Sequence, residues 1–114
     1  LTIFAATESG GMIMAKCKIY IAGPITGDPD YKAKFGAVKQ TLEEQGYIVL
    51  NPAELPEGMT AGDYMRICMA MLDVADGIYM LPGWERSRGA EIEHRVAAYS
   101  IKPIIYVAGE GEEE

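Results

Sequence analysis

The fold of this chain is decided by the stretch KIYIAGP at residues 18–24. Its first five residues are rich in β-branched and aromatic side chains, which is typical of a buried strand, and the Gly-Pro pair ends that strand. The apolar residues that follow have the spacing of one helix face: Tyr31, Phe35, Val38 and Leu42. That helix is expected to end at Gly46, because glycine favours the position just after a helix. A buried strand followed directly by an amphipathic helix begins a parallel α/β sheet.

The rest of the chain continues to alternate short β-rich runs with helical periods. The sequence predicts strands at residues 47–50, 77–81 and 103–107, and helices at residues 64–75 and 87–100. With right-handed crossovers the predicted fold class is α/β, a flavodoxin-like (Rossmann-like) doubly wound parallel sheet of about four to five strands in the order 2-1-3-4. Ligands of such sheets bind outside the carboxyl ends of the strands, here after Ala22 and Leu81.

A chain of 114 residues is sized for one compact domain. We expect this domain at residues 16–108, preceded by an extension at residues 1–15 and followed by an acidic tail at residues 109–114. The formal net charge is −7, and the tail supplies four of the acidic residues. The chain lacks the basic stripe with interleaved aromatic residues that binds polynucleotides. The predicted partner is therefore a small molecule and no polynucleotide.

The longest apolar runs fall far short of the roughly 20 residues of a membrane helix, so we expect a soluble protein without a membrane partner. Cys17 and Cys68 are too few and too far apart for a disulfide framework or a zinc site, so we expect a reducing cytoplasm and no metal. The helix at residues 64–75 is apolar on nearly every side. This predicts either a homodimer or larger homo-oligomer that covers the helix, or a deeply buried central helix.

Two loops stand at the predicted ligand-binding edge. The loop at residues 23–28 leaves the first strand and enters a helix, so its N–H groups could face an anion such as phosphate; the alternative is an ordinary tight turn. The second loop contains Trp84, Arg86 and Arg88. Its Ser87 is a plausible N-cap of the next helix and could also help to bind a phosphate, with an arginine supplying charge. Trp84 either stacks on a base or covers the loop.

One acidic residue of the third predicted helix is expected to be buried. Glu93 lies on the small apolar stripe of that helix, whereas Glu91 is turned roughly 160° away from it. A carboxylate on a buried stripe is costly unless it is paired or used, so Glu93 is a candidate nucleophile or general base, with a structural ion pair as the alternative. His94 is one residue off the stripe and is expected either on the surface or in contact with site residues without touching the ligand. Asp73 is a further, open candidate.

Tyr20 lies on the face of the first strand opposite Ile19 and Ile21, and its hydroxyl group either reaches the site or belongs to the core. Three segments, at residues 19–24, 73–76 and 87–97, resemble the nucleoside 2-deoxyribosyltransferase-like superfamily. The resemblance extends over residues 18–107. It is closest to a small bacterial and phage branch, often of unassigned activity, that shares the signature LPGWExSxGA seen here at residues 81–90.

The resemblance implies a flavodoxin-like fold, a dimer or larger assembly, and cleavage of the N-glycosidic bond of deoxynucleosides or their 5′-monophosphates without a metal or other cofactor. The superfamily pattern Ser-x-Gly-x-x-x-Glu carries the nucleophile and falls here on Ser87, Gly89 and Glu93. A serine in the first position resembles the branch that binds a 5′-phosphate. The remaining implied site residues are the orienting Tyr20, the loop residues Gly23, Pro24 and Ile25, Arg88, and Trp84 near the base.

One position departs from the superfamily. An aspartate usually stands four residues after the position of Tyr64, and this chain has Cys68 there. A buried thiol is a poor proton donor to a leaving base, so the acid role is either lost or moved to Asp73 or a water. A non-catalytic nucleotide-binding or sensing module is therefore the first alternative to an enzyme. A flavodoxin-type electron carrier is the second, although only Thr26 remains of a hydroxyl-rich phosphate loop.

Overall fold

The computed structural model describes residues 16–107 of the chain. The expected extension at residues 1–15 and the acidic tail at residues 109–114 lie outside the described residues. Within the described range no helix is long and apolar enough to cross a membrane. The elements follow one another as β1(Lys18–Ala22), α1(Tyr31–Glu44), β2(Ile48–Leu50), η2(Pro52–Glu54), α2(Ala61–Val74), β3(Gly77–Met80), η3(Trp84–Arg86), α3(Arg88–Tyr99) and β4(Ile104–Tyr106).

Every helix and strand predicted above is present, with small shifts of the ends. The largest shift is at α2, which begins at Ala61 rather than at residue 64. Its first turn is fixed by a capping box, in which the Thr60 hydroxyl accepts from the Asp63 N–H at 3.1 Å and the Asp63 carboxylate accepts from the Thr60 N–H at 3.1 Å. These polar residues lie outside the apolar period, so the spacing of apolar residues did not reveal the start of the helix.

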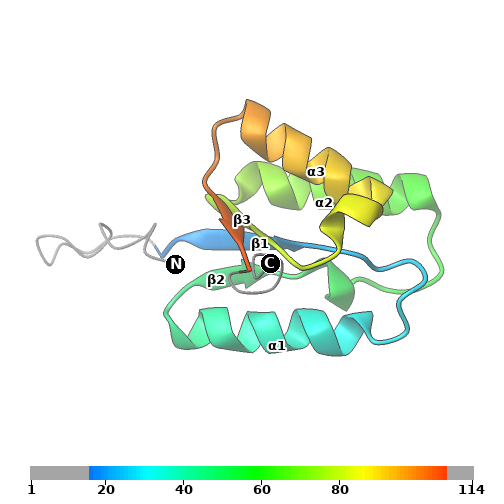
Figure 1. The fold of residues 1–114 in the computed structure, drawn as a ribbon, viewed down its shortest axis with the longest axis horizontal. Coiled ribbons are helices and arrows are strands. Elements are labelled where there is room, and N and C mark those ends of the chain that lie inside the picture. The colour runs from blue at the N-terminus through cyan, green and yellow to red at the C-terminus, as the bar shows by residue number, and fades with distance from the viewer. Residues whose placement is uncertain (1–15, 108–114) are drawn as a thin grey trace, which may run out of the picture.

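The four strands form one parallel sheet in the order β2-β1-β3-β4, which confirms the predicted order 2-1-3-4. Helix α1 covers one face of the sheet, and α2 and α3 lie together over the other face (Figure 1). The order reverses between β1 and β3, because β1 connects to β2 on one side and β3 connects to β4 on the other. This is the place at which open α/β sheets bind ligands.

Alternate residues of β1 contribute to different layers of the core. Ile19 packs in the cluster that contains Leu42 of α1, and Ile21 packs with Phe35 of the same helix. Tyr20 points to the opposite face and belongs to the cluster formed with α2 and α3. The period of two along a strand therefore places the tyrosine opposite Ile19 and Ile21, as predicted, and this is the face that α2 and α3 cover.

The loops after β1 and β3 approach each other closely. A Cβ atom on Gly23 would lie 2.7 Å from the Leu81 Cβ, so only glycine fits at this point without a shift of the neighbouring loop. Gly83, with φ of 86°, supplies the left-handed turn that leads into η3. The two loops are thus held side by side at the carboxyl edge of the sheet.

Candidate active site

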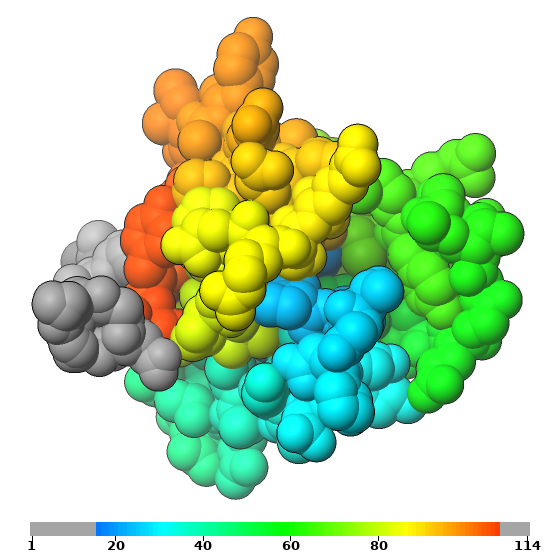
Figure 2. All heavy atoms as spheres, turned by 45° about the vertical axis from the view of Figure 1, so that its right-hand side comes forward, coloured from blue at the N-terminus to red at the C-terminus, as the bar shows by residue number. Residues whose placement is uncertain are grey.

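A cavity of about 470 Å³ lies at this edge, above the end of β1 and between α2 and α3. Figure 2 shows it as a hollow among the loop after β1, the α2 region and the start of α3, with an atom of β1 at its floor. Its size is in the range of small-molecule sites. The sequence-predicted site residues that line it are Tyr20, Gly23, Ile25, Ser87, Arg88, Gly89 and Glu93.

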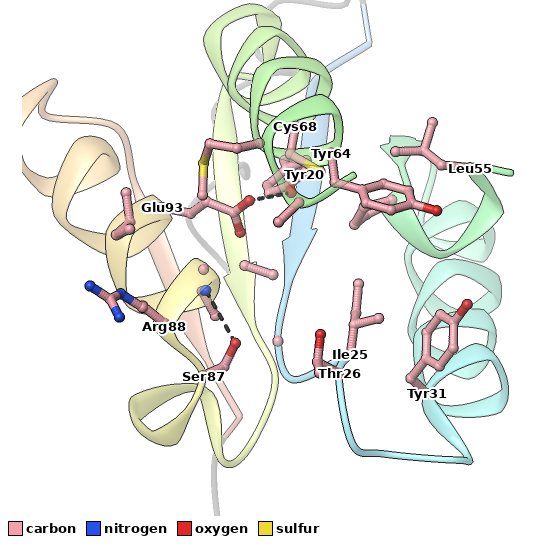
Figure 3. Close-up of a pocket in the computed structure, with 18 residues that line it drawn as sticks. Tyr20, Ile25, Thr26, Tyr31, Leu55, Tyr64, Cys68, Ser87, Arg88 and Glu93 are labelled. Atoms are coloured by element: carbon pink, nitrogen blue, oxygen red, sulfur yellow. Dashed lines mark hydrogen bonds between the residues drawn. The ribbon is translucent and has the colours of Figure 1, made fainter. Parts of the chain in front are cut away.

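Glu93 is the buried carboxylate of the cavity. Its side chain lies on the same face of α3 as Ala90 and Ala97, and only 7% of the residue is exposed. The Tyr20 hydroxyl donates a hydrogen bond of 2.8 Å to Glu93 Oε2 (Figure 3). The predicted burial of Glu93 is confirmed, and the hydrogen bond shows that the Tyr20 side chain reaches this carboxylate from β1.

Burial dominates the electrostatics of this pair. It raises the pKa of Glu93 from its ordinary value of 4.5 to about 7, and the hydrogen bond from Tyr20 opposes the rise. The Glu93 carboxyl group therefore titrates near neutral pH instead of in the acidic range. Burial and the charge of Glu93 together raise the pKa of Tyr20 well above its usual range, so the tyrosine keeps its proton and remains a donor.

Cys68 of α2 is the third polar group at the deep end of the cavity. The residue is 7% exposed, and its thiol lies beside the Tyr20 hydroxyl group (Figure 3). Burial raises the pKa of the thiol, and the nearby charge of Glu93 acts in the same direction. The thiol therefore stays protonated at neutral pH, beside the Tyr20 and Glu93 pair (Figure 3).

The amino end of α3 borders the cavity on the other side. The Ser87 side chain caps the helix by accepting from the Ala90 N–H at 3.3 Å. Among the described residues, the N–H groups of Arg88 and Gly89 have no hydrogen-bond partner. The Arg88 guanidinium points away from the cavity in Figure 3, so this border offers main-chain N–H groups and the positive end of the helix dipole rather than a guanidinium.

An aromatic and apolar wall faces Glu93 across the cavity. It is formed by Tyr31 of α1, Leu55 after η2 and Tyr64 of α2 (Figure 3). The Tyr64 hydroxyl donates to the Pro56 carbonyl oxygen at 2.6 Å and accepts from the Met59 N–H at 3.2 Å, so its proton is already engaged. These residues were not among the predicted site residues, because apolar and aromatic side chains at helical spacing look like ordinary core.

Three predicted site residues do not line the cavity. Trp84 stacks on His94 with ring centroids 4.2 Å apart, and the ring of Tyr106 lies beside both. Trp84 thus packs against these two rings and does not line the cavity. Pro24 lies one residue before the lining Ile25 and approaches Gly83. Asp73 is exposed near the carboxyl end of α2, where its carbonyl oxygen accepts from Lys102 Nζ at 3.3 Å, at the edge of the sheet opposite the cavity.

Within residues 16–107 no group of three or more His, Cys, Asp or Glu side chains could hold a metal ion. Cys17 and Cys68 are both free cysteines. The chemistry that the described cavity can offer is therefore that of one buried carboxylate, its tyrosine and thiol neighbours, and the main-chain donors at the start of α3.

Comparison with solved structures identifies the class of fold. The "2-desoxiribosyltransferase from Leishmania mexicana" superposes with a TM-score of 0.65 at 23% sequence identity, over 79% of this chain and 63% of that protein. A conserved protein from Enterococcus faecalis V583 gives a TM-score of 0.64 at 19% identity, over 88% of this chain and 68% of that one. This chain therefore has the flavodoxin-like fold of a 2-deoxyribosyltransferase, and it spans less than two thirds of the length of the Leishmania protein.

The chain belongs to the family described as "Domain of unknown function (DUF4406)", which matches residues 17–106. No curated protein matches the chain. The fold expected from the resemblance is confirmed by these findings. The activity and the role of Glu93 stay predictions.

Proposed function

We propose that the protein cleaves the N-glycosidic bond of deoxynucleoside 5′-monophosphates or deoxynucleosides, with Glu93 as the nucleophile. The observation that carries this proposal is the buried Glu93 carboxylate, which receives a hydrogen bond of 2.8 Å from Tyr20 inside a cavity of ligand size. A buried carboxylate without a cationic partner is costly, and such groups are concentrated at functional sites. The similar fold of the Leishmania 2-desoxiribosyltransferase supports the same class of chemistry.

The proposed reaction is a displacement in two steps. The ionised Glu93 attacks C1′ of the sugar through an oxocarbenium-like transition state, so that a C1′–oxygen bond forms as the C1′–nitrogen bond breaks and its electron pair leaves with the base. Water, or an acceptor base in a transferase, then attacks C1′ and releases Glu93. Tyr20 keeps its proton and holds the carboxylate oxygen in place. No step needs a redox group.

The dimensions of α3 fit a sugar phosphate. Ser87 and Glu93 are six residues apart on one helix, which corresponds to a rise of about 9 Å. A 5′-phosphate at the free N–H groups of Arg88 and Gly89 would therefore place C1′ of the same nucleotide within reach of Glu93. The loop of Gly23 would close over the phosphate from the β1 side, and the base would face the wall of Tyr31 and Tyr64.

The first experiment is product analysis with the four common deoxynucleoside 5′-monophosphates. We expect the wild-type protein to release free base, detected by chromatography, and Glu93→Gln to lower the rate by at least about 10³-fold, since glutamine retains the hydrogen bond with Tyr20 but cannot form the ester. The matched control is Asp73→Asn, which removes an exposed carboxylate away from the cavity and should leave the rate unchanged. Equal rates for wild type and Glu93→Gln would refute the role of Glu93.

A nucleotide-binding module is the second candidate function, and the thiol of Cys68 favours it. A cavity that binds nucleotides but protonates the leaving base poorly would retain ligands without cleaving them. Saturable binding of a deoxynucleoside monophosphate by calorimetry, with no base released over days, would support the module.

We also propose that a second copy of the chain covers α2. Ile67, Met69 and Met71 of this helix are only partly buried, and Val74 is 54% exposed. Apolar side chains left open to this extent on one helix favour association with another copy. Light scattering after size exclusion should give twice the chain mass for the wild type. Val74→Arg should shift the measured mass toward that of the single chain, and its added charge is favourable near the carboxyl end of the helix. A monomeric wild type would refute the assembly.

A further inference from the structure

Among the described residues that line the cavity, Glu93 is the one acidic residue and Arg88 the one basic residue. Glu93 is buried, and the Arg88 guanidinium points outward in Figure 3, so no opposing charge from these residues lies beside the carboxylate. No ion pair involving Glu93 occurs within the described residues. When Glu93 is ionised, the deep end of the cavity therefore carries an unbalanced negative charge in a region of low dielectric, which attracts a cation.

The described residues of the same region offer no acid to a departing base. The proton of Tyr20 is donated to Glu93, and the proton of Tyr64 is donated to the Pro56 carbonyl oxygen. Burial raises the pKa of Cys68, so its thiol gives up a proton less readily than an ordinary cysteine does. Glycosidases of the common two-carboxylate type separate the roles of nucleophile and acid between two residues, and this cavity has one carboxylate for both.

From these two observations we propose that the cavity selects nucleotides with a positively charged base. The charge lies on the ring whose nitrogen is bonded to C1′, as in pyridinium or N-alkylated purine nucleotides. The inference rests on the function proposed above. When the C1′–nitrogen bond breaks, its electron pair neutralises the cationic ring, and the base departs as a neutral molecule without a proton donor. Glu93 forms the C1′–oxygen bond, water resolves it, and one proton is released to solvent for each base.

The wall opposite Glu93 fits such a base. Tyr31, Tyr64 and Leu55 present aromatic and apolar surface to the cavity, and a planar cationic ring gains from contact with aromatic faces. Before the bond breaks, the ring cation also lies near the Glu93 carboxylate and favours its ionised, nucleophilic form. A neutral base can stack on the same wall but lacks the cation–π attraction and the attraction to Glu93, and it must leave with a negative charge or wait for a proton from water.

The test compares two 5′-phosphates of 2′-deoxyribose, one with nicotinamide as a permanently cationic base and one with guanine as a neutral base. For the wild type we expect kcat/KM for nicotinamide release to exceed that for guanine release by at least about 100-fold, after subtraction of the uncatalysed rates. Cys68→Asp places a carboxyl group beside Tyr20 and should raise guanine release by about 100-fold while nicotinamide release changes by less than about threefold. Cys68→Asn, of similar shape but without an acid, should raise neither.

The outcomes separate the inference from the function on which it rests. Guanine release as fast as nicotinamide release by the wild type, or an equal effect of Cys68→Asp on both substrates, would overturn the preference for cations and leave cleavage by Glu93 standing. Release of neither base would instead overturn the proposed function. If Cys68→Asp does not fold, the wild-type ratio of the two substrates still decides, because equal values contradict the inference.

Discussion

The two faces of the sheet are built from alternate residues of the same strands, yet they differ in what they enclose. On the α1 face, Ile19 and Ile21 meet Phe35 and Leu42, and none of these four side chains is exposed. On the face of α2 and α3, the central strand contributes Tyr20, and its neighbours include a thiol, a carboxylate and a cavity. The difference shows how one strand can build a closed apolar core with one set of residues and line a cavity with the other.

The energetic consequences of the two faces have opposite signs. Each large apolar side chain that is fully buried contributes about 1.5–3 kcal/mol to folding, so the α1 face is a plain source of stability. Glu93, on the other face, is buried although its charged form prefers water, and its raised pKa reflects the free-energy cost of burying the ionised carboxylate. We therefore expect variants of the two faces to separate stability from activity.

The largest effect on stability is expected from Phe35→Ala on the α1 face. Removing a ring that is fully buried beside Ile21 should lower the free energy of unfolding by about 3–5 kcal/mol, measured by urea denaturation. Gly36→Ala is the matched control on the same helix, since its added Cβ meets no atom within 4 Å, and stability should stay equal or rise by up to about 1 kcal/mol. A loss below about 1 kcal/mol for Phe35→Ala would mean that the α1 face is not a major source of stability.

A smaller effect, of the opposite sign, is expected from Glu93→Gln on the other face. The pKa of Glu93 is about 7 in the folded protein and 4.5 as its ordinary value, so the folded state binds a proton more tightly than the unfolded state. The contribution of the protonated group to stability is fully present below pH 4.5 and is lost as the pH rises through 7, a change of about 3 kcal/mol.

Glu93→Gln, which stays neutral, should therefore be more stable than the wild type at pH 8 by up to about 3 kcal/mol, with the gap closing toward pH 4.5. Urea denaturation at several pH values measures this gap. Glu91→Gln is the control, because Glu91 is a partly exposed carboxylate that pairs with Arg95. If the difference in stability between Glu93→Gln and the wild type did not change with pH, Glu93 would not have a raised pKa, and burial on this face would carry no electrostatic cost.

The smallest effect is expected from Tyr20→Phe, which leaves the carboxylate in place. It removes a hydrogen bond to the ionised Glu93, so kcat/KM for base release should fall by about 10- to 100-fold. The activity of the wild type should rise with pH through about 7 as Glu93 ionises, and the same rise in Tyr20→Phe should move to higher pH, because the lost bond had lowered the pKa of Glu93. A reduced rate with an unmoved pH profile would assign Tyr20 a purely structural role.

Local patterns sufficed to predict the order of the sheet and the burial of Glu93. The period of two along residues 18–22 places Tyr20 opposite Ile19 and Ile21, and the helical spacing of Ala90, Glu93 and Ala97 places the carboxylate on the sheet face. Both patterns act within one element, and the parallel topology then brings the two elements together. The contact between Tyr20 and Glu93 joins residues 73 positions apart. The local patterns left open whether the Tyr20 hydroxyl belongs to the site or to the core, and the family resemblance implied that it orients Glu93.

The rest of the site depends on contacts between elements that no local pattern specifies. The sequence left two roles open for Trp84, stacking on a base or covering the loop; in the structure its ring packs on His94 and Tyr106 and does not line the cavity. The opposite wall was missed because Tyr31 and Tyr64 occupy apolar helix positions that equally suit a core. Tyr64 carried one signal, its spacing of four residues from Cys68 on the same face of α2.

The donors at the start of α3 belong to the peptide backbone and not to any side chain. If they anchor a ligand, the anchor is insensitive to most point substitutions, whereas the wall of Tyr31, Leu55 and Tyr64 consists of side chains, which substitution changes one at a time. A scaffold divided in this way can evolve new specificities. Substitutions in the wall would yield paralogues that accept different rings, while the main-chain donors would continue to bind the other end of the ligand. Directed evolution of this protein should accordingly randomise the wall first.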